Sequence, residues 1–405
     1  MHLPAKTYLA RTLILLGLVF GASVRPVGAQ IAKLEHPDTT AGNFFGVAVS
    51  VDGDRAIIGA SAENACGVNS GAAYVFHWND RERRWAEEAR LVPEDCDAGR
   101  FFGRAVSISG NRVLIGSAQS FFATKTSNAA YVFELDPVTG TWTQTARLTG
   151  DPAMEEGAFG SSVSLDGDRA LITTSGDPSE GRYHGAAYIF ERDPETNTWK
   201  QTARLVGSGA REYGIFGGSG DLEGDRLVVA ASTYVRYRPG SVYIFERDPQ
   251  TGIWNEVKRI SGIDDFFISV DLDGNRLIVG ESRHGRRKSG IATIYTRSHA
   301  GEWRPTATIR PPSPYDDGAF GAQVSLSGDR ALVVGYDEQL GFEFNIDRVV
   351  YSFVFDPVKG TWRYERVFDI GEIAFGSAID HTDRWAFIGE ASQQKAGSAY
   401  VVRLF

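Results

Sequence analysis

The acidic segment at residues 271–277 (DLDGNRL) has the residue types and the spacing of a cation site. Asp271 and Asp273 place carboxylates at alternate positions beside Gly274, and Asn275 adds an amide oxygen. A calcium loop begins in the same way, with oxygen ligands at its first, third and fifth positions. The same letters also predict a strand, a two-residue turn and a second strand. The choice depends on whether the segment recurs elsewhere in the chain.

Adjacent carboxylates at Glu155-Glu156 and Asp316-Asp317 are candidates for general acid and base chemistry. Loops that brought such pairs together would suit the cleavage of a polysaccharide by hydrolysis or elimination. The histidines are scattered, however, and no Gly-x-Ser-x-Gly nucleophile motif surrounds them. Because carboxylates in loops are usually solvated, we predict no catalytic residue and no enzyme activity. A hydrolase or lyase that acts on polysaccharide through loop carboxylates is the alternative.

Two basic segments, the first of which is also rich in tyrosine, predict a binding surface. Arginine side chains and aromatic faces suit an extracellular glycan or protein partner. The candidate ligand-binding residues are Tyr234, Arg236, Tyr237, Arg238, Arg283, His284, Arg286, Arg287 and Lys288, with the aromatic pair Phe121 and Phe122. The alternative, purely structural interpretation is that these charges are solvated and that the aromatic rings fold onto their own loops.

A Phe-Gly pair recurs along the chain at steps of 50 to 57 residues, which indicates an array of internal repeats. The copies are Phe45-Gly46, Phe102-Gly103, Phe159-Gly160, Phe216-Gly217, Phe320-Gly321 and Phe375-Gly376, with a degenerate copy at Phe266-Phe267. Seven copies leave no room for a second domain. Residues 30–405 are therefore predicted to form one domain.

Each repeat has the pattern of four short β-strands. In the third copy, residues 159–165 alternate large and small side chains, Asp166-Gly167 is a hairpin signal, and residues 169–173, 185–190 and 199–205 follow as strands. Period-two alternation without helical periodicity predicts an all-β fold. Seven four-stranded antiparallel units favour a β-propeller with seven blades. A solenoid is the rival architecture, but it needs polar capping repeats, which the sequence lacks.

The two ends of the chain complement each other. The last repeat stops after its third strand, and residues 31–35 (IAKLE) resemble the missing fourth strand. We therefore predict that Ile31–Glu35 pairs with the C-terminal strands and closes the ring, which removes the open sheet edges.

The repeat resembles the FG-GAP repeat. Its Phe-Gly pair is followed by Ile57-Ile58-Gly59-Ala60 or Leu114-Ile115-Gly116-Ser117 in the second strand, and then by G-x-x-Y-V-F. This repeat builds the seven-bladed heads of integrin alpha chains and of many secreted bacterial proteins. The resemblance implies a secreted, non-catalytic module for extracellular ligand binding or cell adhesion. A structural scaffold without a small ligand is a further alternative, because one fold hosts many functions.

The N-terminal segment has the layout of a secretory signal peptide. Lys6 and Arg11 precede an apolar run at residues 12–24, and Val27-Gly28-Ala29 offers a cleavage site after Ala29. We therefore predict a signal peptide at residues 1–29 and an extracellular, monomeric protein without a membrane span. The formal net charge of −9 argues against a nucleic-acid partner. The two cysteines, Cys66 and Cys96, predict one disulfide in an oxidising compartment.

The recurrence decides between the two interpretations of residues 271–277. The position of Asp271 is serine in four copies, and Leu277-Ile278-Val279 follows the turn at once, without further oxygen ligands. The segment is therefore predicted to be a hairpin, with no metal and no other cofactor, and calcium is disfavoured. An arginine follows the turn in every copy. We expect it to pair with an acid of a neighbouring hairpin, such as Arg169 with Asp193.

Overall fold

The computed structural model describes residues 31–35, 42–118, 128–150, 158–175, 185–209, 214–233, 239–263, 265, 268–285, 287–314, 316–336, 348–370, 375–392 and 397–404. The predicted signal peptide lies outside these residues. Within these ranges, no helix is long and apolar enough to cross a membrane.

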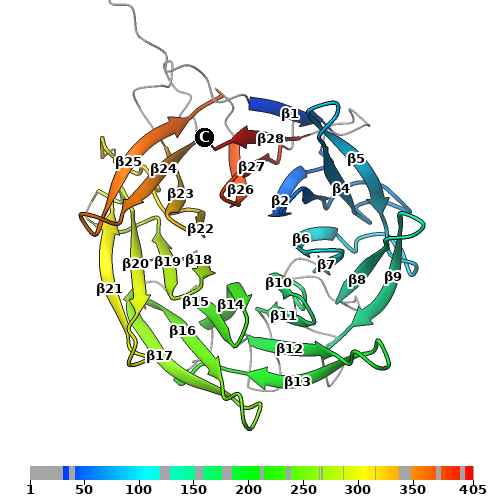
Figure 1. Ribbon diagram of the computed structural model, residues 1–405, viewed down its shortest axis with the longest axis horizontal. Coiled ribbons are helices and arrows are strands. Elements are labelled where there is room, and N and C mark those ends of the chain that lie inside the picture. Colours follow the sequence, from blue (N-terminus) through cyan, green and yellow to red (C-terminus); the bar gives the residue numbers. More distant parts are fainter. Residues whose placement is uncertain are drawn as a thin grey trace, which may run out of the picture.

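The described residues form seven four-stranded antiparallel sheets, which confirms the predicted all-β propeller. Figure 1 shows them as blades around a central axis, with the first strand of each blade innermost. Blades 1 to 3 contain β2 (Phe45–Asp52), β3 (Arg55–Ala60), β4 (Ala72–Asn79) and β5 (Arg84–Leu91); β6 (Phe102–Ser109), β7 (Arg112–Ser117), β8 (Ala129–Asp136) and β9 (Thr141–Leu148); and β10 (Val163–Asp166), β11 (Arg169–Thr174), β12 (Ala186–Arg192) and β13 (Trp199–Leu205).

Blades 4 to 7 follow the same order. They contain β14 (Gly214–Glu223), β15 (Arg226–Thr233), β16 (Gly240–Arg247) and β17 (Trp254–Ile263); β18 (Ile268–Asp273), β19 (Arg276–Glu281), β20 (Ile291–Arg297) and β21 (Trp303–Ile309); β22 (Val324–Ser327), β23 (Arg330–Tyr336), β24 (Arg348–Asp356) and β25 (Thr361–Phe368); and β26 (Phe375–His381), β27 (Trp385–Glu390) and β28 (Ser398–Arg403), completed by β1 (Ile31–Glu35).

The N-terminal strand closes the ring, as predicted. Strand β1 pairs antiparallel with β28, from Ile31 opposite Val402 to Glu35 opposite Ser398, and the two lie side by side at the top of Figure 1. Leu34 is buried in the same apolar cluster as Trp385 of β27. The last blade is therefore built from both ends of the chain.

The Phe-Gly pair serves two different contacts. Phe102 is fully buried and meets Tyr131 of its own blade edge-on, with the ring centroids 5.5 Å apart. Gly103 has φ +87°, and its carbonyl oxygen lies so close to Gly59 of the preceding blade that a Cβ there would collide with it. In the third blade Thr173 occupies the position of Gly59, and its hydroxyl donates to the carbonyl of Gly217 at 2.7 Å. The motif therefore records close backbone contact between neighbouring blades.

The turn at Gly274 joins β18 and β19, with Asp273 opposite Arg276, so residues 271–277 form a hairpin. The expected pairing of Arg169 with Asp193 is wrong. The Arg169 Nε donates to Glu191 at 3.0 Å, and its Nη1 reaches Asp225 in the hairpin of the next blade at 3.1 Å. The arginine lies on the inner hairpin, which faces the next blade, whereas Asp193 lies in the outer turn of its own blade and pairs with Lys200.

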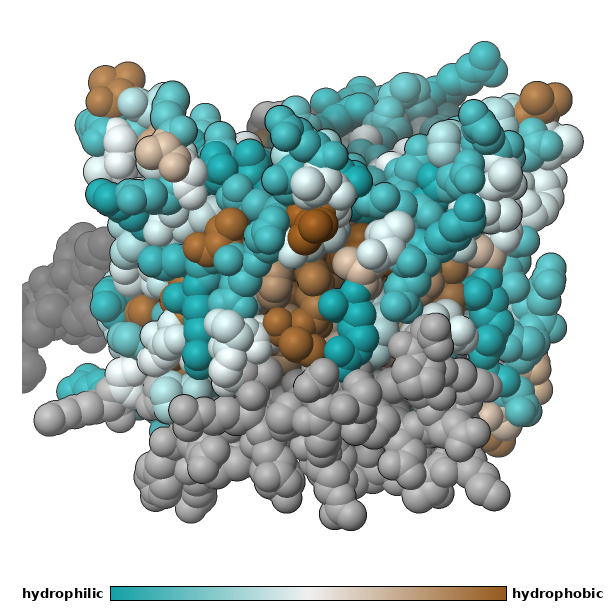
Figure 2. All heavy atoms as spheres, turned by 90° about the horizontal axis from the view of Figure 1, so that it is seen from below, coloured by the Kyte–Doolittle hydropathy of each residue, from teal (hydrophilic) through white to brown (hydrophobic). Residues whose placement is uncertain are grey.

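The outer rim of the propeller is mainly hydrophilic on the side shown in Figure 2, with hydrophobic atoms gathered near its middle. Val138 and Val358 are exposed in equivalent outer turns, each just after an Asp-Pro pair. Single exposed apolar residues of this kind are ordinary on soluble surfaces.

Candidate functional site

The innermost strands carry a ring of polar side chains around the axis. In each repeat the fifth residue after the phenylalanine of the Phe-Gly position is serine or aspartate, although the next residue along the strand is apolar in six of the seven repeats. The ring consists of Ser50, Ser107, Ser164, Asp221, Asp271, Ser325 and Asp380, one from each blade. We call these seven residues the axial ring.

The axial ring links each blade to the next. Six of its members accept a hydrogen bond from a backbone amide on the innermost strand of the following blade. The bonds run from Ile108 to Ser50 (3.3 Å), Leu165 to Ser107 (3.0 Å), Leu222 to Ser164 (3.1 Å), Leu272 to Asp221 (2.9 Å), Leu326 to Asp271 (2.6 Å) and Val51 to Asp380 (2.8 Å). The last bond crosses the seam between the two ends of the propeller.

The seventh link uses a side chain. Ser325 Oγ lies 2.7 Å from Nδ1 of His381, whose position is apolar in the other six repeats. The amide of His381 donates instead to Asp380 at 2.8 Å. Burial lowers the pKa of His381 to about 3, and the nearby Arg330 charge adds to the decrease. The imidazole is therefore neutral at physiological pH.

Two carboxylates of the axial ring have raised pKa values. Burial raises the pKa of Asp271 well above its ordinary value, and the neighbouring charges of Asp221 and Asp380 raise it further. Burial also raises the pKa of Asp380 to about 7, although hydrogen bonds from Val51 and His381 oppose the rise. A carboxyl group that titrates near neutral pH can exchange protons with a substrate.

A second polar level lies two residues further along the innermost strands, toward the hairpin turns. Asp52, Asp166 and Asp273 accept hydrogen bonds from Gly110, Gly224 and Gly328 at 2.7, 2.6 and 2.7 Å. Each bond again joins one blade to the next. This end of the axis is acidic.

A cavity of about 460 Å³, which we call the axial cavity, lies on the side of the axial ring away from the hairpin turns. It is lined by the beginnings of the innermost strands, and Val49, Val106 and Ile379 in its lining directly precede axial-ring members. The polar residues of its lining are several serines, Gln323 and Arg104. This volume lies within the range of small-molecule sites in proteins.

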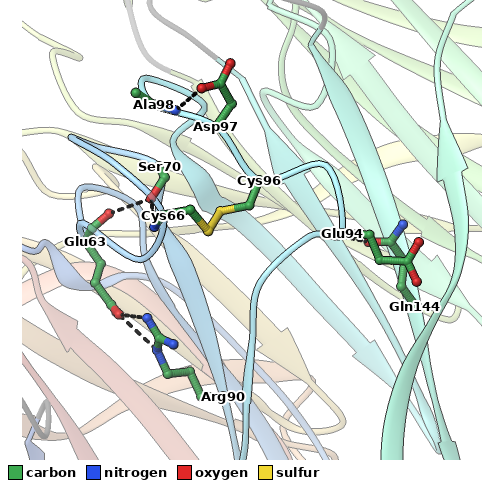
Figure 3. The surroundings of a disulfide bond; sticks show 9 residues. All are labelled: Glu63, Cys66, Ser70, Arg90, Glu94, Cys96, Asp97, Ala98 and Gln144. Carbon is green, nitrogen blue, oxygen red and sulfur yellow. Dashed lines mark hydrogen bonds and ion pairs between the residues drawn. A yellow bond between two sulfur atoms is a disulfide. The ribbon is translucent and has the colours of Figure 1, made fainter.

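The two cysteines form a disulfide, with their Cα atoms 5.9 Å apart. Figure 3 shows that it joins the loop between β3 and β4 to the loop before β6. Beside it, Glu63 accepts hydrogen bonds from Arg90 Nη2 at 2.5 Å and from the Tyr74 hydroxyl at 2.8 Å. The disulfide therefore ties blade 1 to the loop that enters blade 2, and the partly buried ion pair holds the loop between β3 and β4 against β5 of the same blade.

The proposed basic surface is balanced by acids in the part that the structure describes. Arg287 lies 3.6 Å from Asp316, and Lys288 lies 3.7 Å from Asp317. His284 lies 3.3 Å from Glu281, and the Arg283 amide donates to Asp265 at 2.9 Å. The acids at 316 and 317 come from the loop that leads into blade 6, and only the folded ring brings them to this loop of blade 5.

Several candidate residues lie outside the described residues. These are Tyr234, Arg236, Tyr237, Arg238, Arg286, Phe121, Phe122 and the pair Glu155-Glu156. In the described part of the chain, no group of three or more His, Cys, Asp or Glu residues is arranged to hold a metal ion. The axial ring was not identified from the sequence. The signal for it is a polar residue at the same position of every innermost strand.

The fold and the axial site define a seven-bladed propeller with a polar central cavity. The family model described as the FG-GAP repeat matches residues 29–76, 85–133 and 142–190, so the chain carries FG-GAP repeats and the predicted resemblance is confirmed. Among curated proteins, none matches the chain in sequence.

Three solved structures resemble the chain at 12% identity each. A proposed 6-phosphogluconolactonase from Bacteroides fragilis has a TM-score of 0.50, with coverage of 80% of this chain and 84% of that one. The periplasmic gluconolactonase PpgL of Pseudomonas aeruginosa has a TM-score of 0.48, with coverage of 80% and 85%. A protein from Lactobacillus plantarum also has a TM-score of 0.48, with coverage of 79% and 84%. At this identity the likeness shows the fold alone.

These comparisons correct the predicted function. The non-catalytic binding or adhesion module was inferred from the integrin-like proteins that share the repeat, whereas the solved Bacteroides fragilis propeller similar to this chain is named as a lactonase, which is an enzyme. The predicted role as a non-catalytic binding or adhesion module is therefore wrong. A propeller of this kind positions strand residues around its axis, and it does so in catalysts as well as in binding modules.

Proposed function

We propose that this protein is a hydrolase that cleaves an ester or glycosidic bond of a small, carbohydrate-derived substrate at the end of the axial cavity where it meets the axial ring. One observation carries the proposal: a polar cavity of about 460 Å³ adjoins a ring in which the pKa of Asp271 and that of Asp380 are both raised. Concave sites with polar groups and perturbed titratable residues are the usual places for catalysis.

The two carboxyl groups suit complementary roles. Asp271, whose pKa burial and neighbouring acids raise well above its ordinary value, holds a proton that it can give to a leaving oxygen. Asp380, with a pKa raised to about 7, can take a proton from the attacking water. For a lactone, the water oxygen bonds to the carbonyl carbon, the ring C–O bond breaks, and the alcohol oxygen receives the proton. Water is the only co-reactant, and atoms and charge balance.

The strand carboxylates suit this chemistry better than the loop carboxylates considered from the sequence. In the described part, Asp316 and Asp317 are exposed and lie next to Arg287 and Lys288. Asp271 and Asp380 instead lie on rigid central strands, and amide hydrogen bonds at 2.6 and 2.8 Å hold their orientation. Residues on strands hold a catalytic geometry more tightly than residues on loops.

The test is a hydrolysis assay with a panel of sugar lactones, chromogenic esters and aryl glycosides. The names of the solved propellers make sugar lactones the first group to try. We expect Asp271→Asn and Asp380→Asn each to lower kcat by at least ~100-fold. Asparagine keeps the size and the amide-accepting oxygen, so the ring stays linked.

Asp52→Asn is the matched control. Asp52 also accepts a backbone amide from the next blade, but it is exposed at the opposite end of the axis. Its replacement should leave turnover unchanged. Turnover that survives in both axial-ring variants, or no turnover on any member of the panel, would contradict the proposed function.

We further propose that the protein is exported. The Cys66–Cys96 disulfide supports this, because disulfides persist in oxidising compartments. N-terminal sequencing of the protein secreted by an expressing cell tests the proposal, and Gln30 is the expected first residue. Retention of residues 1–29 in the folded protein would contradict it.

A further inference from the structure

One position in the wall of the axial cavity departs from the repeat pattern. The second residue after the phenylalanine is Val47, Ser161, Gly218, Ile268, Ala322 or Ser377 in six repeats, and each of these lines the cavity. In the second repeat the same position holds Arg104, which also lines it. The cavity therefore has a long cationic side chain on one side, where the other blades present small or apolar groups.

The charge of Arg104 is not balanced inside the cavity. The described residues that line the cavity include no aspartate and no glutamate, although the chain as a whole has a formal net charge of −9. The arginines of the inner hairpins, such as Arg112 and Arg169, pair with acids of their own and the next blade. In the described part of the chain, the Arg104 guanidinium has no ion pair or hydrogen bond of this kind.

The other polar groups of the cavity are neutral. Serines of several blades, among them Ser162, Ser219 and Ser269, line the cavity together with Gln323. Hydroxyl and amide groups can each donate and accept, which matches the hydroxyl groups of a polyol. A guanidinium matches a carboxylate or a phosphate, to which it donates two parallel hydrogen bonds.

We propose that the axial cavity binds an anionic polyol, a sugar acid or a sugar phosphate, whose charged group is held by Arg104. The inference rests on the proposed function for the place of the site, and it adds the chemical class of the ligand. The anionic group lies at the Arg104 side of the cavity. The hydroxylated carbon chain extends past the serines toward Asp271 and Asp380, where the bond to be cleaved would lie.

The volume of the cavity and the positions of the charged groups along the axis support the binding of one small ligand. A volume of about 460 Å³ accommodates a monosaccharide derivative with its bound water. The acids of the axis lie beyond the cavity, in the axial ring and at the hairpin level, and a protonated Asp271 reduces their repulsion of an anion. An anionic ligand is thereby oriented with its charge away from the carboxylates.

Calorimetric titration at pH 7 tests the inference with four probes: D-gluconate, D-glucose 6-phosphate, D-glucose and inorganic phosphate. We expect gluconate, glucose 6-phosphate or both to bind more tightly than glucose and phosphate. Comparing the first two probes distinguishes a carboxylate ligand from a phosphate ligand. Arg104→Gln should weaken binding of the anionic polyol by ~10- to 100-fold, which is the usual loss for a hydrogen bond to a charged group.

Arg104→Lys and Arg81→Gln serve as companion variants. Lysine keeps the charge without the planar fork and should restore part of the affinity. Arg81 is exposed in the turn between β4 and β5, away from the cavity, so its replacement should change nothing. Circular dichroism and the unfolding midpoint of each variant show whether the propeller remains folded.

Each result has a defined meaning. Glucose that binds as tightly as both gluconate and glucose 6-phosphate, no binding of either anionic polyol, or no effect of Arg104→Gln overturns the inference. Phosphate binding as tight as glucose 6-phosphate identifies only an adventitious anion site and also overturns it. Anionic polyols that bind through Arg104 without turnover of any panel substrate refute the proposed hydrolase and leave the inference standing. Turnover that requires Asp271 but is unchanged in Arg104→Gln refutes the inference and leaves the proposed hydrolase standing.

Discussion

Replacing Asp380 with asparagine should stabilise the protein at alkaline pH, because the folded state then no longer carries a confined charge. Its carboxyl group has a pKa raised from 3.8 to about 7 by burial. A raised carboxyl pKa means that the native state favours the protonated form. The stability from Asp380 is therefore fully present below pH 3.8, and it is lost as the pH rises through 7.

The size of this loss follows from the shift. Each pKa unit corresponds to 1.36 kcal/mol, so the shift of Asp380 is equivalent to at most about 4 kcal/mol. Asp380 is repelled by the neighbouring carboxylates of Asp221 and Asp271. His381, the next residue in the chain, is neutral and supplies no compensating positive charge. Removing the Asp380 charge also relieves Asp271. The gain in the unfolding free energy of Asp380→Asn at pH 8 is thus expected to be a few kcal/mol.

Urea unfolding followed by tryptophan fluorescence between pH 4 and pH 8 measures the effect. Trp385, which is buried on the strand after Asp380, reports on this seam. Wild type and Asp380→Asn should have similar unfolding free energies at pH 4 and should diverge as the pH rises. Asp52→Asn is the control, because water already solvates its exposed carboxylate. Parallel pH profiles for wild type and Asp380→Asn would refute the reasoning.

This prediction also bears on the proposed function. A charge that destabilises the fold is retained where it serves catalysis, so Asp380→Asn should gain stability and lose turnover together. A variant that gains stability and keeps full activity would show that the axial ring is structural only.

Two further predictions concern the histidine link and the disulfide. His381→Leu restores the apolar residue of the other six repeats. Burial lowers the pKa of His381 to about 3, so the native state favours the neutral imidazole. The stability that His381 contributes is therefore lost as the pH falls from 6.5 through 3. The variant should lose less unfolding free energy than wild type over this range. Urea unfolding at pH 7 and pH 4 measures this, and an equal loss in both proteins would contradict it. Replacing both Cys66 and Cys96 with serine should lower the unfolding free energy by about 3 to 4 kcal/mol, because the bond closes a loop with a sequence separation of 30. Denaturation of the double variant beside oxidised wild type measures this loss, and equal stability would show that the bond does not constrain the unfolded chain.

The sequence by itself determined the architecture, because the physics of a repeat is local. The Phe-Gly spacing, the Asp-Gly turns and the period-two strands specify four-stranded units, and seven such units close into a ring. The match between residues 31–35 and the missing last strand also follows from local pattern. Strand β1 lies on β28 as this pattern predicts.

The tertiary structure decided which side chains meet across blades. Arg169 reaches Asp225 rather than Asp193, and acids of blade 6 lie beside Arg287 and Lys288, because residues about 30 to 56 positions apart become neighbours only when the ring forms. The same holds for the axis. In the sequence, Asp271 resembles a ligand of a calcium loop, but the hairpin pattern around it predicts no metal site and indicates no other function for it. Closure of the propeller encloses it with Asp221 and Asp380, and this enclosure raises its pKa. Burial and proximity to like charges are properties of the folded ring, so no local pattern in the chain contains them.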